Sequence, residues 1–210
     1  MPRYVPPPLT DVELFAYATN SVDTQHIPSG SGFWYFMALG YKHAADDLVD
    51  TISSAHRGQE WRAAPVLFLY RHYVELHLKS LLLDAGELLD DQQQVPPQHY
   101  LLVLWKRVRA LLLKVESDES DRLSAAAGPA APWLLRVDAI VAQLDAVDPS
   151  SFAFRYPVDN KGQPSLPPSF RFEAVNVRSV IGELHSVLTS ATNGVDYLRD
   201  VKRDAGASAI

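Results

Sequence analysis

The 210-residue chain contains no cysteine, which excludes disulfides, thiolate metal sites and a cysteine nucleophile. It also lacks a run of about 20 apolar residues that could span a bilayer. The first residues contain no signal-peptide core, so we expect a cytoplasmic protein without a membrane partner. The hydrophobic fraction of 47% and the charged fraction of 21% are typical of a globular protein.

Motifs for phosphate, acyl and zinc chemistry are absent as well. The sequence has no Gly-rich phosphate loop, Walker motif or Gly-x-Ser-x-Gly elbow, and its seven histidines show no His-Glu-x-x-His spacing. We therefore predict no metal and no cofactor. The formal net charge of −6 disfavours a sequence-independent binder of duplex nucleic acid, because phosphate neutralisation supplies most of that affinity. A small basic site for RNA stays compatible with this charge.

One stretch, PVLFLYRHYVELHLKSLLL at 65–83, is apolar nearly all round at helical spacing. It predicts a buried central helix over 64–84 in an all-α domain. The whole pattern predicts a helical bundle of about five main helices, with a small β-hairpin-like insertion between the last two. Alternating aromatic residues around the turn sequence DNKG suggest that insertion.

The expected domain organisation is simple. Residues 1–32 form a proline-rich arm with a short helix, residues 33–203 form the helical domain, and residues 204–210 form a loose tail. The acidic sequence ESDESD and the Ala-rich sequence after it are expected to form a linker before the fourth helix.

Arg71, Glu75 and Lys79 interrupt the apolar run and stack along one stripe at about 100° per residue. Buried charges are costly unless they are paired, so we expect an ion-pair ladder at four-residue spacing. His72 lies at the edge of this stripe, and Arg155 is a further candidate partner for Glu75. The ladder is either purely structural or part of a site, and the sequence leaves both readings open.

Three motifs, in this order, resemble the HEPN superfamily of helical domains. RHYVELHLKSLL in the central helix is similar to the family's second helix, in which Lys follows Glu by four residues. HYLLVLW at 99–105 resembles the entry into the next helix, and FRYP at 154–157 resembles the Arg-Tyr-Pro after the third long helix.

This resemblance implies a helical bundle that is commonly dimeric and often associated with RNA. Active members are metal-independent endoribonucleases with an Arg followed, after roughly four to six residues, by a His on a late helix. Such a His serves as acid or base, and the Arg stabilises charge on phosphate. The resemblance therefore implies an RNA-cleaving or RNA-binding toxin or defence component, with an antitoxin or defence-system protein as a candidate partner.

Two segments fit the Arg-His spacing. Arg71 precedes His77 with five residues between them, but the two side chains point about 120° apart on a helix. Arg178 precedes His185 with six residues between them, and these side chains fall within about 20° of one face of the last helix.

The first hypothesis for a site is the central helix, and the late pair is the second. In the first, Arg71 binds phosphate, His72 is the acid or base, and Glu75 orients one of them. Lys79 and Arg155 are predicted to bind substrate. In the second, the catalytic residues are Arg178 and His185.

Alternatives to an RNA-cleaving enzyme stay open. The chain could be a non-catalytic HEPN-like scaffold or nucleotide-binding module in which the polar stripe only fixes the fold, or an unrelated helical bundle. We also expect a homodimer, partly because the predicted hairpin is unusually aromatic. The residues concerned are Phe152, Phe154, Phe170 and Phe172.

Overall fold

The computed structural model describes residue 27 and residues 31–55, 58–97, 99–122 and 132–207. Contacts divide the chain into two units, residues 1–30 and residues 31–210, and all the described helices belong to the second. The predicted short helix of the N-terminal arm lies outside the described residues. The five α-helices are α1 (Trp34–Ser54), α2 (Ala63–Leu88), α3 (Leu101–Arg122), α4 (Pro132–Val147) and α5 (Ala174–Ala207).

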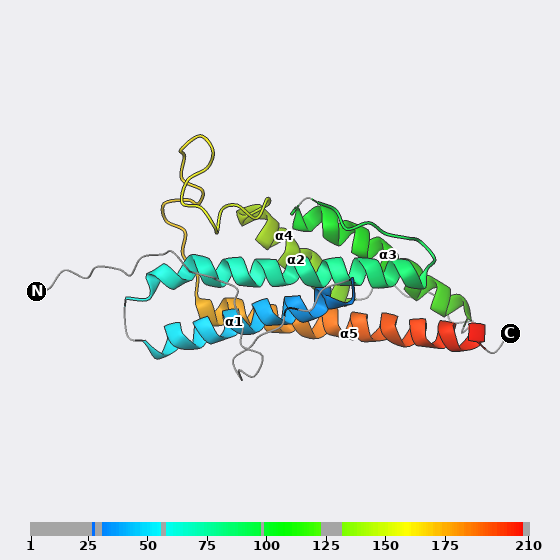
Figure 1. The fold of residues 1–210 in the computed structure, drawn as a ribbon. Coiled ribbons are helices and arrows are strands. Elements are labelled where there is room, and N and C mark those ends of the chain that lie inside the picture. The colour runs from blue at the N-terminus through cyan, green and yellow to red at the C-terminus, as the bar shows by residue number, and fades with distance from the viewer. Residues whose placement is uncertain (1–26, 28–30, 56–57, 98, 123–131, 208–210) are drawn as a thin grey trace, which may run out of the picture. The chain divides into compact units, whose positions relative to one another are not determined.

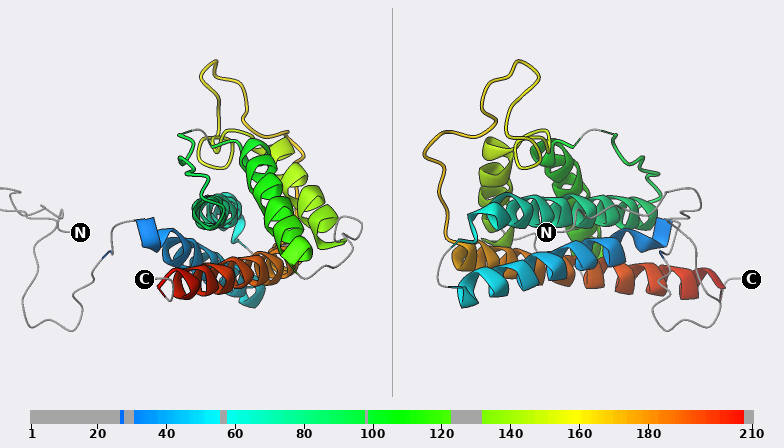
Figure 2. Two further views of the ribbon diagram at one scale, coloured as in Figure 1. Left: turned by 90° about the vertical axis from the view of Figure 1, so that its right-hand side faces the viewer. Right: turned by 60° about the vertical axis from the view of Figure 1, so that its left-hand side comes forward.

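Helix α2 is the central element of this unit, as its apolar sequence predicts. It contacts α1, α3 and α5, while α4 lies against α3 and α5 (Figure 1 and Figure 2). Nearly every residue from Tyr70 to Leu82 is buried. The prediction of a buried central helix in an all-α bundle is therefore confirmed, and the helix extends four residues beyond the expected end at residue 84.

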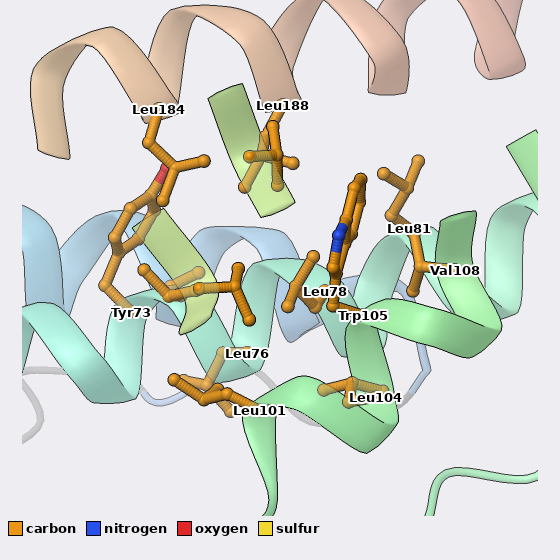
Figure 3. Packing of buried hydrophobic residues seen from close by; sticks show 14 of the residues in the cluster. Tyr73, Leu76, Leu78, Leu81, Leu101, Leu104, Trp105, Val108, Leu184 and Leu188 are labelled. Atoms are coloured by element: carbon orange, nitrogen blue, oxygen red, sulfur yellow. The ribbon is translucent and has the colours of Figure 1, made fainter. Parts of the chain in front are cut away.

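The hydrophobic core lies between α2 and the helices around it. Figure 3 shows Leu78 and Leu81 of α2 with Trp105 of α3 and Leu188 of α5, which belong to one buried cluster. The indole Nε1 of Trp105 donates a hydrogen bond of 2.6 Å to Asp138, so this large core residue has no unsatisfied polar atom. Packing of this kind holds the polar residues of α2 in fixed positions.

The predicted β-hairpin between α4 and α5 is not present. The described residues contain no strand, and this insertion has a single antiparallel bridge, between Val158 and Pro164. The turn itself forms as expected, because the Asp159 carboxylate accepts hydrogen bonds from the Lys161 and Gln163 amides. The prolines of this segment lack the N–H groups that a ladder of strands requires, which explains why pairing stops after one bridge.

Two other boundaries differ from the sequence prediction. Helix α3 continues through the acidic residues 116–121, which were expected to form a linker. Helix α5 continues to Ala207, so residues 204–207 of the predicted tail are helical. In both places charged residues and alanine, which are tolerated in a helix, prolong an apolar helix past its last core contact.

Candidate functional site

Glu75 is the centre of a buried ion-pair network on α2. Its Oε2 accepts a hydrogen bond of 3.1 Å from Arg71 Nη1, and its Oε1 accepts one of 2.7 Å from Lys79 Nζ. The three residues are between 0% and 6% exposed. The predicted ladder is therefore confirmed. Burial alone raises the pKa of Glu75, but the hydrogen bonds from Lys79 and His99 outweigh it and hold this pKa below its usual value.

Asp148, the residue directly after α4, is a member of the network that the sequence reading missed. Its carboxylate lies 3.5 Å from Arg71 Nε. Its Oδ1 accepts hydrogen bonds of 2.6 and 2.9 Å from the amides of Phe152 and Ala153. The signal that could have revealed it is the sequence DPSS after a helix, since Asp favours such local backbone capping.

Arg71 connects three parts of the chain through its guanidinium group. Besides Glu75, it donates hydrogen bonds to the backbone carbonyls of Asp148, Pro149 and His99. Two buried cations thus face two buried carboxylates, which is the balance that buried charges require. Arg71 has no free edge for a phosphate, contrary to the role expected for it, and its position is explained by the fold.

His99, two residues before the start of α3, is the accessible member of the network. Its Nδ1 lies 2.8 Å from Glu75 Oε1, and its side chain is 49% exposed. The Arg71 guanidinium holds its backbone carbonyl. The motif HYLLVLW predicts only a helix entry at this residue, and its pairing with Glu75 was not predicted from the sequence. A carboxylate that fixes one imidazole nitrogen leaves the other for acid–base work.

His72 is half-buried between two rings. Its imidazole meets the Tyr41 ring edge-on at 4.4 Å and stacks on the Phe68 ring at 5.6 Å. It has no hydrogen-bond partner within the described residues. Glu75 was expected to orient Arg71 or His72, and the structure shows that it bonds Arg71 and His99.

The charges of the first network act on His72. Burial lowers the pKa of His72, the Glu75 carboxylate raises it, and the charges of Lys79, Arg71 and His99 lower it further. The pKa of His72 therefore lies below its usual value, which favours the neutral imidazole near pH 7.

Arg155 does not reach Glu75. It is exposed, and its Nε donates a hydrogen bond to the Ser151 carbonyl. Its guanidinium lies 6.0 Å from the centre of the Phe68 ring and 5.5 Å from that of Tyr156. The alternative of a buried Arg155–Glu75 pair is therefore wrong, and Arg155 has no carboxylate partner among the described residues.

The late pair lies on the other side of α2, on α5. Arg178 pairs with Asp50 and lies 3.8 Å from Asp46, so two carboxylates occupy its guanidinium. Asp46 in turn accepts a hydrogen bond of 2.7 Å from the Tyr70 hydroxyl. His185 contacts Tyr73 rather than Arg178. The two side chains share a face of the helix, as expected, but each already has its own partner.

His185 belongs to a second buried polar network, between α2 and α5. The Tyr73 hydroxyl lies 3.0 Å from Nδ1 of His185 and 3.0 Å from Nδ1 of His77. Nε2 of His77 lies 3.1 Å from the Thr192 hydroxyl, which donates to the Leu188 carbonyl. His77 is fully buried here and points away from Arg71, so the spacing Arg71-His77 does not produce a shared site.

The hydrogen bonds of this second network fix where its protons lie. The Thr192 hydroxyl uses its proton on a carbonyl, so it accepts from Nε2–H of neutral His77. Nδ1 of His77 therefore accepts from the Tyr73 hydroxyl, which in turn accepts from Nδ1–H of His185. Burial, followed by the charge of His185, lowers the pKa of His77 to about 3. The network is stable only while His77 stays neutral.

Two hollows of about 570 and 600 Å³ are lined by parts of the described chain away from the first network, and neither includes a predicted site residue. No group of three or more His, Asp or Glu side chains in the described ranges is arranged to hold a metal. Within those ranges no helix is long and apolar enough to cross a membrane.

Comparisons with protein-family models, with curated proteins and with solved structures find no match for this chain. The HEPN resemblance therefore depends on the three motifs alone. Parts of two motifs meet in the first network, namely the Arg-Glu-Lys stripe of α2 and the His before α3. Arg155 of the third motif lies near the Phe68 ring instead.

Proposed function

We propose that the protein is a HEPN-like, metal-independent endoribonuclease whose active site is the accessible end of the Glu75 network. The observation that carries this proposal is His99, which is half exposed and oriented by a buried carboxylate at 2.8 Å. Lys79 donates to the same Glu75 oxygen, and the charges of Glu75, Lys79 and His99 act on the half-buried His72. Two imidazoles and an ammonium group are the groups that cleavage of an RNA phosphodiester without a metal requires.

Each group has a role in this mechanism. His72, neutral near pH 7, takes the proton of the ribose 2′-hydroxyl as its oxygen attacks the phosphorus. The bond from phosphorus to the 5′ oxygen breaks, and His99 supplies a proton to that oxygen. Lys79 stabilises the additional negative charge on the phosphoryl oxygens. The products are a 2′,3′-cyclic phosphate and a 5′-hydroxyl.

The alternative function is a non-catalytic scaffold. It is favoured by the charge balance of the network, in which Arg71 and Lys79 face Glu75 and Asp148 with almost no exposure. Such an arrangement can serve to fix the ends of α3 and α4 on α2 and nothing more.

The deciding experiment is cleavage of tRNA, mRNA and short oligonucleotides by the purified protein in the presence of EDTA. His72→Gln and His99→Gln should each lower kcat by about 10²–10⁴-fold, the usual contribution of an acid or base. His43→Gln, which changes an exposed histidine of α1, is the matched control. His185→Gln tests the late pair.

The results distinguish the proposed active site from the late pair and from a scaffold without activity. Loss of cleavage in His185→Gln alone would move the site to α5 and refute the proposed one. RNA left intact by the parent protein would refute the enzyme and favour the scaffold. Each variant must keep the melting temperature of the parent, so that a lost activity is not a lost fold.

A further inference from the structure

A row of rings and one cation runs along the surface beside His72. Tyr41 of α1 meets His72, His72 stacks on Phe68, and the Arg155 guanidinium lies between Phe68 and Tyr156. Neighbours in the row are between 4.4 and 6.0 Å apart. Three separate parts of the chain supply it, namely α1, α2 and the loop after α4. The row ends at the Phe152 ring, 4.5 Å from that of Tyr156.

The outer end of this row is accessible, and its arginine has hydrogen-bond donors without a partner among the described residues. Tyr156 is 48% exposed, and Arg155 is exposed as well. Arg155 uses its Nε on a backbone carbonyl, and its two terminal nitrogens have no acceptor among the described residues. A flat ring with a neighbouring cation that is not neutralised can hold a planar group by stacking and an anion by charge.

These features suit an unpaired nucleotide better than a duplex. A base in a single strand can leave its stack and lie on an aromatic side chain, whereas a base inside a helix cannot. The net charge of −6 also disfavours the long phosphate contacts that a duplex makes. A local site with one free Arg and several rings needs only one or two phosphates.

We propose that Phe68, Arg155 and Tyr156 form a subsite that stacks one unpaired base of an RNA strand, next to the phosphate held at His72 and His99. This inference rests on the proposed function for the position of that phosphate. The substrate class is then single-stranded RNA or the loop of a folded RNA. Arg155 contacts the phosphate of the stacked nucleotide, and Tyr156, which is 48% exposed, supplies the ring.

The test measures binding separately from cleavage. The probe is a fluorescent RNA dodecamer with 2′-O-methyl groups on every ribose, which removes the attacking hydroxyl and prevents cleavage. It is used as a single strand and annealed to its complement, and inorganic polyphosphate serves as a probe of charge alone. The variants are Tyr156→Leu and Tyr156→Trp, with Tyr197→Leu on α5 as the control, since Tyr197 is 68% exposed.

We expect the single strand to bind at least tenfold more tightly than the duplex. Tyr156→Leu should weaken single-strand binding by about tenfold, the usual size of one base stack, and leave polyphosphate binding unchanged. Tyr156→Trp should keep or tighten it, because tryptophan preserves the ring face. Tyr197→Leu should bind like the parent.

Several outcomes would overturn the subsite. These are no binding of the single strand, equal binding of strand and duplex, or equal losses in Tyr156→Leu and Tyr197→Leu. A loss of polyphosphate binding equal to that of the strand would show that charge alone acts there. If the parent cleaves unmodified RNA and Tyr156→Leu has an unchanged KM, the subsite fails and the enzyme stands. If the parent binds the modified strand but leaves unmodified RNA intact, the subsite stands and the enzyme fails.

Discussion

The buried histidine of the second network gives a quantitative prediction for stability. His77 is fully buried, and its pKa falls from 6.5 to about 3 because burial penalises the imidazolium. Above pH 6.5 His77 is mostly neutral in both the folded and the unfolded chain, so it adds little pH dependence to the free energy of unfolding. Below that value the unfolded chain binds a proton that the folded chain does not. The free energy of unfolding therefore decreases as the pH falls from 6.5 towards 3.

The magnitude follows from the two pKa values. Between pH 7 and pH 5, His77 alone should remove about 2 kcal/mol from the free energy of unfolding. His72 and His185, whose pKa values burial also lowers, act in the same direction. Carboxylates with lowered pKa values, Glu75 and Asp46, lose their contribution only at more acidic pH. Asp84, whose pKa is raised by burial, acts in the opposite direction as the pH falls, so the contribution of His77 is taken from the difference between the parent and a His77 variant.

The assay is urea unfolding at pH 7, 6 and 5, followed by tryptophan fluorescence. The perturbation is His77→Gln, which keeps a donor and an acceptor near Tyr73 and Thr192 but cannot titrate. The variant should be less stable at pH 7, yet should lose about 2 kcal/mol less than the parent on going to pH 5. His43→Gln, at an exposed position, should retain the slope of the parent. Equal losses in His77→Gln and the parent would refute the reasoning.

The remaining predictions concern the ladder, two glycines and the oligomeric state. Glu75→Ala should destabilise the protein by about 3–5 kcal/mol, because it leaves Lys79 buried without a carboxylate and Arg71 with Asp148 alone, and Glu75→Leu should cost less because it refills the volume; melting temperatures equal to that of the parent would contradict the network. Gly86→Ala should lower the melting temperature, since an added Cβ would lie 2.7 Å from the Asp91 carbonyl oxygen, whereas Gly40→Ala, with nothing within 4 Å, should stabilise α1 by about 0.5–1 kcal/mol. A reversed order in chemical denaturation would show that the α2–loop contact is absent. Sedimentation at micromolar concentration should give a homodimer, as the HEPN resemblance implies, and a clean monomer would count against it.

The helices could be predicted from the sequence because each has a continuous apolar face that only a partner helix can cover. The spacing of Arg71, Glu75 and Lys79 also predicted the ladder, since three ions on one buried stripe have few other arrangements. The insertion after α4 could not be predicted in the same way. Its alternating aromatics resemble strands, but Phe154 is buried and the others are half-buried under loop contacts that no periodicity encodes.

The residues that complete the network were missed because they come from distant segments. His99 lies 24 residues after Glu75, and Asp148 lies 77 residues after Arg71, so neither belongs to a helical repeat with its partner on α2. Only closure of α3 and α4 onto α2 brings them together. The local sequence explains His99 as part of the entry into a helix and Asp148 as a turn cap. Because the structure contains both of these local roles, nothing in the local sequence indicated that either residue also belongs to the ion-pair network.

The hydrogen-bond and ion-pair partners of each arginine indicate which of them is available to an anionic substrate. Arg71 and Arg178 were the two arginines first expected to bind phosphate. Arg71 is saturated by Glu75 and backbone carbonyls, and Arg178 pairs with two carboxylates of α1. Arg155, on the surface loop, has no carboxylate partner among the described residues and uses only its Nε on a backbone carbonyl. A phosphate can only compete for donors that the fold has not already used, because displacing a buried partner would leave that partner unpaired. The proposed site for an anionic substrate therefore lies on the outer side of the stripe, where His99 and Arg155 are exposed, and not within the buried ladder of Arg71, Glu75 and Lys79.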